Sequence, residues 1–177
     1  MHRLCTVALA ALLALPCPLH AAENRPVAHV DLARYAGTWH EQAHLPMMFQ
    51  RDCAKNTTAT YTARSDGRID VLNRCTTATG EIKQARGVAR RVGGSTSQLE
   101  VRFAPAFLSF LPFVWGDYWI IDLDPDYRWA MVGSPGRDYL WILSRDRQLD
   151  AAVRQRLVER ARAMGYPVER LVNTPQE

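Results

Sequence analysis

Turn-forming residues divide most of this chain into short segments of about eight to ten residues, and that spacing restricts the folds that it can adopt. Apolar and polar positions alternate within 57–62, 69–73 and 99–103, which predicts strands with one buried face. An Asp-Gly pair at 66–67 lies between the first two of these segments and predicts a hairpin. Further strands are expected over 37–44, 82–92, 115–123, 128–132 and 139–143.

One segment near the carboxyl end has a helical period instead. Apolar residues recur every three or four positions between Asp150, a suitable N-cap, and Gly165, and Pro167 prevents the helix from continuing. We also expect a helical turn at 31–35 and a last strand at 168–172. Eight antiparallel strands followed by one helix fit a closed up-and-down barrel, whose interior can hold one small ligand.

The first 22 residues have the pattern of a removable export signal, with an early arginine, an apolar stretch and small residues before position 23. We expect 23–177 to form a single domain, and no other stretch has the ~20 apolar residues that cross a bilayer. Cys17 raises the alternative of a lipid anchor. Pro16 before it suits that processing poorly, so we favour a freely soluble exported protein.

The cysteines and the charges further restrict the class of protein to which this chain can belong. Cys53 and Cys75 are the cysteines that remain after the signal, and in an exported chain we expect them to form a disulfide at the barrel mouth. The chain has 22 basic and 18 acidic side chains, and the basic ones are scattered rather than gathered in a patch. Nucleic-acid binding is therefore not expected.

The segment from His40 to His44 spells HExxH, which on a helix would supply two zinc ligands and a general base, Glu41. Here the segment alternates like a strand. His40 and His44 would share one face of that strand roughly 13 Å apart, at ~3.3 Å per residue, too far to hold one metal. No later histidine offers a third ligand. We predict two surface histidines, no metal site, no cofactor and no catalytic residue.

Three short motifs resemble the regions by which lipocalins are defined, and their order and spacing match as well. They are Gly37-Thr38-Trp39-His40-Glu41, Gly116-Asp117-Tyr118 and Leu143-Ser144-Arg145. The chain is most similar to bacterial lipocalins and to the related apolipoprotein D group, and the resemblance runs from about 30 to 172. One position departs from the pattern, because His40 stands where a tyrosine is usual.

The resemblance implies an all-β fold, an eight-stranded antiparallel up-and-down β-barrel with one C-terminal α-helix packed outside. It also implies that Gly37, Trp39 and Arg145 are structural residues, with Trp39 at the closed end of the barrel and Arg145 across its ring. Such a contact adds a cation–π attraction of roughly 0.5–2 kcal/mol to the packing.

For function, the resemblance implies binding, storage or transport of a small hydrophobic ligand, a fatty acid or lysophospholipid, without catalysis. It places the protein in the periplasm with a part in maintaining envelope lipids, and it leaves association with the outer membrane open. Two alternatives remain open. One is an enzyme, such as a zinc hydrolase that uses His40, Glu41 and His44, and the other is a ligand-free interaction module that uses 107–113.

Side-chain parity predicts which residues line the barrel. Positions 59 and 61, 69 to 73 and 99 to 103 alternate inward with polar outward neighbours, while 115–123 and 139–143 are apolar on both faces. The ligand-binding residues that we predict are Glu41, Tyr61, Asn73, Phe103, Trp115, Tyr118 and Trp141.

The apolar segment Phe107 to Phe113 is unusual for a soluble barrel. Four roles are open for it: contact with a membrane, a contact in a homodimer, a cover over the cavity mouth, or packing against its own barrel.

Overall fold

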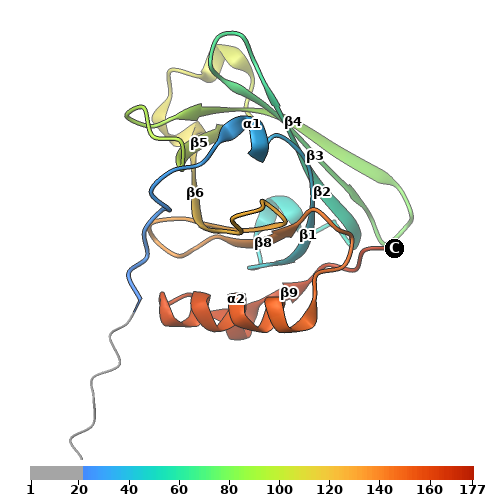
Figure 1. Ribbon diagram of the computed structural model, residues 1–177. Helices are drawn as coiled ribbons and strands as arrows, with labels where there is room; N and C mark the ends of the chain where they lie inside the picture. The colour runs from blue at the N-terminus through green and yellow to red at the C-terminus, as the bar shows by residue number, and fades with distance from the viewer. Residues whose placement is uncertain (1–21) are drawn as a thin grey trace, which may run out of the picture.

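The strands form one antiparallel sheet that closes on itself, because β1 pairs with both β2 and β8 (Figure 1). Their bounds are β1 (Gly37–His44), β2 (Lys55–Ala63), β3 (Ile69–Thr76), β4 (Ile82–Arg91), β5 (Gln98–Arg102), β6 (Gly116–Leu123), β7 (Trp129–Gly133), β8 (Leu140–Ser144) and β9 (Val172–Asn173). Each of the first eight strands pairs with its neighbour in the chain. β9 pairs with the last two residues of β1, Ala43 and His44. The predicted eight-stranded up-and-down barrel is confirmed.

The computed structural model describes residues 22–177. The expected export signal, apart from Ala22, and the candidate lipid-anchor residue Cys17 lie outside the described residues. Among the described helices, none is both long enough and apolar enough to cross a membrane.

Two α-helices have the predicted caps. α1 (Leu32–Tyr35) begins after Asp31, whose carboxylate accepts hydrogen bonds from the next turn, and α2 (Ala151–Ala163) begins after Asp150 in the same way. α2 lies against the outside of the barrel (Figure 1). Its buried residues Leu157 and Ala161 pack onto outward-facing side chains of β1, β6, β7 and β8.

The predicted last strand over 168–172 is wrong in most of its length. Val168–Arg170 form a 3₁₀ turn, η4, and only Val172–Asn173 pair as a strand. Pro167 begins the turn and its carbonyl accepts a hydrogen bond from the Arg170 amide. Because a proline has no amide proton to give to a sheet, the chain bends here before it reaches β1.

Three further 3₁₀ turns lie in loops: η1 (Met48–Gln50), η2 (Ala106–Leu108) and η3 (Pro112–Val114). In an up-and-down barrel the loops after β1, β3, β5 and β7 meet at one end, so η1, η2 and η3 share that end. The other end carries α1 and the fully buried Trp39, which close it.

Two β-bulges change which side chains face inward. The register of β1 against β8 shifts between Glu41 and Ala43, and that of β6 against β7 shifts between Ile120 and Asp122. A bulge moves the following residues to the opposite face of the sheet. As a result Ala43 packs beneath α2, while Glu41 and His44 are close to each other inside the barrel wall.

Candidate functional site

The barrel contains a cavity of about 690 Å³, a size typical of sites for small ligands. Small and aliphatic side chains form much of its wall, including Ala59, Val71, Ala85, Val101 and Leu143. Aromatic side chains surround the mouth, where Phe49, Phe113 and Tyr139 line the same cavity. An apolar tube that is open at one end suits an elongated hydrophobic molecule.

Most of the predicted ligand-binding residues are brought together around this cavity. Glu41, Tyr61, Asn73, Phe103, Tyr118 and Trp141 all line it. Parity reasoning places Tyr61 and Asn73 because β2 and β3 alternate regularly there: Tyr61 pairs with Val71 and Ala59 with Asn73, and all four face inward.

Trp115 is the exception, because it does not line the cavity. Its ring lies under the guanidinium of Arg90, 3.9 Å from the centroid, and its indole nitrogen donates to the Ser109 carbonyl. Trp115 and Tyr118 are three residues apart, so a regular strand directs them to opposite faces. The expectation that both form aromatic cavity walls is therefore wrong for Trp115.

Three tyrosine hydroxyls form a chain at the closed end of the cavity. The Tyr118 hydroxyl is 2.8 Å from that of Tyr35 and 2.7 Å from that of Tyr61. Burial raises the pKa of each of these phenols well above its usual range, and the hydroxyls stay protonated. The floor of the cavity is thus polar but uncharged.

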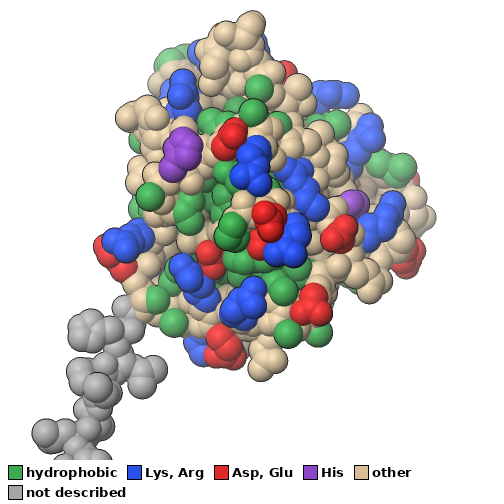
Figure 2. Space-filling model, in the orientation of Figure 1, with side chains coloured by type: hydrophobic (Ala, Val, Ile, Leu, Met, Phe, Trp, Pro, Cys, Tyr) green, Lys and Arg blue, Asp and Glu red, His purple; other side chains and the backbone are tan. Residues whose placement is uncertain are grey.

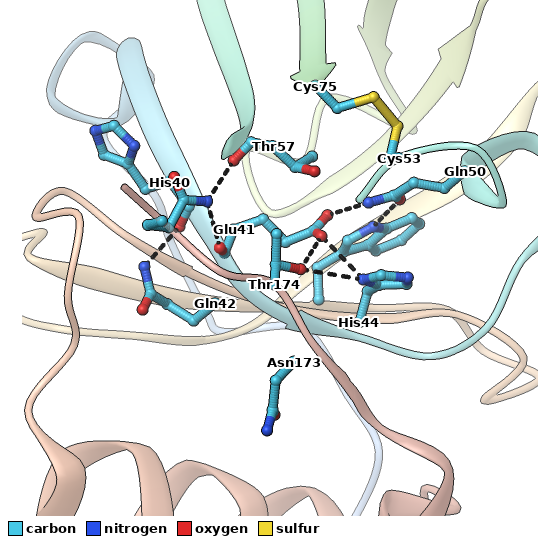
Figure 3. A network of polar contacts seen from close by, with 12 residues as sticks. His40, Glu41, Gln42, His44, Gln50, Cys53, Thr57, Cys75, Asn173 and Thr174 are labelled. Atoms are coloured by element: carbon cyan, nitrogen blue, oxygen red, sulfur yellow. Dashed lines mark hydrogen bonds and ion pairs between the residues drawn. A yellow bond between two sulfur atoms is a disulfide. The ribbon is translucent and has the colours of Figure 1, made fainter. Parts of the chain in front are cut away.

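A buried carboxylate lies in the cavity wall above this floor (Figure 3). One oxygen of Glu41 accepts from the Gln50 amide at 2.6 Å, and the other accepts from the Thr174 hydroxyl at 2.5 Å and lies 2.9 Å from His44 Nδ1. Gln50 also accepts a long hydrogen bond from the Trp141 indole. The network satisfies the hydrogen-bonding capacity of a group that is costly to bury without partners.

Sequence reasoning missed three members of this network, Gln50, His44 and Thr174. Gln50 reaches the barrel from the loop that the predicted disulfide fastens, since Cys53 is bonded to Cys75 of β3 with 5.5 Å between the Cα atoms. Thr174 comes from the C-terminal tail, which no local pattern directs to this site. The disulfide was the one signal that could have placed Gln50 near the cavity.

The HExxH segment is a strand, β1, as predicted, but its histidines do not share a face. His44 is only 8% exposed and contacts Glu41, whereas His40 points away from that network (Figure 3). The prediction of a surface His44 is wrong because the bulge after Glu41 turns this residue inward. Within residues 22–177 no three His, Cys, Asp or Glu side chains gather in a way that could hold a metal ion.

The loops around the cavity mouth expose an unusual number of large apolar side chains. Phe107, Phe110 and Phe113 are 74%, 77% and 80% exposed, so these three rings are not packed into the core of the barrel. We call the following set the apolar rim: Met48, Phe49, Ile82, Phe103, Phe107, Phe110, Phe113 and Tyr139. On the face seen in Figure 2, by contrast, basic and acidic side chains are interspersed.

Comparison with known proteins agrees with this architecture. The lipocalin-like domain family matches residues 30–176. Temperature-induced lipocalin-1 of Arabidopsis thaliana is 41% identical over 87% of this chain and 83% of its own. Outer membrane lipoprotein Blc of Vibrio cholerae is 36% identical over 98% of this chain and 96% of its own.

Solved structures show the same fold at lower identity. Insecticyanin from the tobacco hornworm Manduca sexta aligns with a TM-score of 0.67 at 18% identity, over 89% of this chain and 86% of its own. Together with the family match over residues 30–176, these similarities show that the chain belongs to the lipocalin family.

Proposed function

We propose that this lipocalin binds a single-chain amphiphile, a fatty acid or lysophospholipid, in its barrel and stores or transports it without catalysis. The observation that carries the proposal is the cavity of about 690 Å³, apolar along its wall, closed by Trp39 at one end and open at the other. One acyl chain fits such a tube lengthwise, while its head group stays near the mouth.

Native mass spectrometry tests this proposal. Purified protein titrated with an 18-carbon lysophosphatidylcholine is expected to take up one molecule. The variant Ala85→Trp fills the cavity with an indole and should bind several-fold less, whereas Arg86→Trp, on the outward face of β4, should bind like the wild type. A wild-type barrel that stays empty with both fatty acid and lysophospholipid would contradict the proposal.

Location belongs to the same proposal. We infer export to the periplasm and a role in maintaining envelope lipids, supported by the relatives in Vibrio cholerae and Escherichia coli that are named outer membrane lipoproteins. A lipid anchor at Cys17 is the alternative to a soluble periplasmic protein. If Cys17→Ser moves the protein from the membrane fraction to the soluble fraction, the anchor is present.

The hydrolase alternative makes a separate prediction about metal content. A zinc enzyme would purify with stoichiometric zinc and lose it in His40→Ala. The strand conformation of β1, with His40 and His44 on opposite faces, supports a protein without this site. Elemental analysis of wild type and His40→Ala decides the matter, and zinc that depends on His40 would favour the enzyme.

The apolar rim supports contact with a membrane surface during exchange of ligand. Its side chains encircle the entrance to the cavity, so a lipid could pass between bilayer and barrel without crossing water. A homodimer or a ligand-free interaction module would use the same surface, and each of these predicts an assembly of protein chains instead.

A further inference from the structure

The wall of the barrel has a break between β1 and β2. These strands stay paired only as far as His40 and Thr58, and from there β1 pairs with β9 and β8, while β2 pairs with β3 alone. We call the gap between 41–44 of β1 and 55–57 of β2 the side window. Both edges of the side window contribute residues that line the cavity, so the break lies in the cavity wall.

The C-terminal tail fills the side window like a short strand, and we call its residues 174–177 the plug. The Thr174 amide donates to the Gln42 carbonyl of β1 at 3.0 Å. On the other side, the Pro175 carbonyl accepts from the Asn56 amide of β2 at 2.8 Å. The plug is therefore bonded to both edges and replaces the ladder that the two strands do not form with each other.

Side chains of the plug complete the closure. The Gln176 amide donates to the carbonyls of Glu41 and Thr57, at 2.7 and 2.9 Å, and these residues would form the next pair if the register of β1 and β2 continued. The Thr174 hydroxyl donates to the Glu41 carboxylate, which lines the cavity (Figure 3). The plug thus covers from outside a side chain that the cavity touches from inside.

The contacts that hold the plug are polar. None of the hydrophobic clusters found among residues 22–177 includes a residue of the plug. Glu177 pairs with Lys55 at 2.6 Å, but an ion pair at the surface contributes little stability. Oε1 of Gln176 is buried without a partner within the described part of the chain, an acceptor that water would satisfy on release. Segments with so few apolar contacts open more readily than the core beneath them.

We propose that the plug detaches from the folded barrel, and that its release opens the side window as a second entrance through which an acyl chain passes between β1 and β2. A strand that lies between two others holds them about 9–10 Å apart. An acyl chain is narrower than a peptide strand, so the gap that the plug leaves admits one. The inference rests on the proposed function, since it names a route for the same ligand.

The plug should control the rates of ligand exchange and leave the affinity unchanged. No residue of the plug lines the cavity, so its release removes no contact with a bound chain. A change that lowers only the barrier between the free and bound states speeds binding and release by the same factor. This equal effect on both rates distinguishes an entrance from a residue that holds the ligand.

Stopped-flow fluorescence with 11-(dansylamino)undecanoate tests the inference. Association is followed on mixing the probe with protein, and dissociation is followed on displacing it with excess 1-oleoyl-lysophosphatidylcholine. Gln176→Ala removes the two bridging hydrogen bonds, and a variant without 174–177 removes the whole plug. Gln155→Ala makes the same change at an exposed position of α2 and is the matched control. Asp124→Asn, far from the side window in the β6–β7 turn, controls for a general loss of stability.

Both plug variants should raise the association and dissociation rate constants by the same factor. We expect about three- to tenfold for Gln176→Ala, the effect of one or two hydrogen bonds, and a larger factor without the plug, with the Kd within about twofold of wild type. Gln155→Ala and Asp124→Asn should exchange ligand like wild type. If the truncated protein does not fold, Gln176→Ala carries the test alone.

Three results would overturn the inference. Wild-type rates in both plug variants would show that ligand passes only through the mouth, and the proposed function would stand. Faster release with unchanged association would show that the plug merely supports the bound ligand, and the proposed function would again stand. If wild-type protein binds neither the dansyl probe nor the lysophospholipid, the proposed function itself fails and the second entrance with it.

Discussion

The guanidinium of Arg145 lies over the ring of Trp39, 3.9 Å from its centroid, and joins the end of β8 to the start of β1. The same group donates to the carbonyls of Arg34, Tyr35, Ala36 and Thr38, so it also fixes α1 across the barrel end. Gly37 has a φ of +95°, and a Cβ there would lie 3.3 Å from the Arg145 side chain. This one side chain therefore ties together the closed end of the cavity.

Replacing Arg145 by lysine should show that the planar group matters more than the charge. Lysine keeps the positive charge but cannot donate to four carbonyls in one plane or stack on an indole. We expect Arg145→Lys to lower the free energy of unfolding by about 2–4 kcal/mol, because several hydrogen bonds to exposed and part-buried carbonyls are lost together with the stacking on Trp39. Urea titration measures this, with Arg68→Lys in an exposed loop as the control. A loss no larger than that of the control would contradict the role.

How far sequence predicts this site depends on how regular each strand is. Where inward residues alternate with polar ones, as at Tyr61 and Asn73, parity alone places the side chain in the cavity. Parity fails at the two bulges, because an extra residue in a strand leaves no signature in composition. His44 turns inward for this reason.

Contacts between distant parts of the chain were also beyond sequence reasoning. Thr174 reaches Glu41 across 133 positions, and Gln176 reaches Thr57 across 119. The tail lies along β1 and β2 where these strands stop pairing with each other, since their pairing ends at His40 and Thr58. The place where β1 and β2 separate, which the tail fills, can be seen only in the folded barrel. Motifs and turn spacing, which are local, predicted the barrel, its caps and its closed end.

Removing the disulfide should lower the free energy of unfolding. The bridge between Cys53 and Cys75 spans 22 positions, and closing a loop of that length stabilises the fold by about 3 kcal/mol in the chain-entropy model. The double variant Cys53→Ser, Cys75→Ser should lose roughly that amount in urea titration. Wild-type protein kept reduced with dithiothreitol should match the double variant. Equal stability of the oxidised protein and the double variant would contradict this prediction.

Asp124 should make the free energy of unfolding depend on pH in the acid range. Its carboxylate accepts from the Arg128 guanidinium at 2.8 and 3.1 Å and from two backbone amides, and the Arg128 hydrogen bonds hold the pKa of Asp124 below its usual value. A carboxyl with a lower pKa in the folded state stabilises the fold above its ordinary pKa, and this stability is lost as pH falls through the lowered value.

The variant Asp124→Asn should therefore melt a few degrees below wild type at pH 7, and the two should converge in acid below the lowered pKa. Asp126→Asn, whose side chain is exposed and lies 3.9 Å from Arg128, is the matched control and should melt like wild type. Melting curves across pH measure both. A difference that stays constant down to the acid limit would show that the charge of Asp124 is not the cause.

Changes in the apolar rim should separate membrane contact from ligand binding. Phe107 and Phe110 are exposed and do not line the cavity, so Phe107→Ser with Phe110→Ser should leave titrations with lysophosphatidylcholine unchanged. Burial of one phenylalanine stabilises association by roughly 1.5–3 kcal/mol, so sedimentation with phosphatidylethanolamine and phosphatidylglycerol vesicles should fall by more than about tenfold. Val92→Ser, at the opposite end of the barrel, should sediment like wild type. If wild type ignores vesicles but sediments as a dimer that the double variant breaks, the rim joins two protein chains instead.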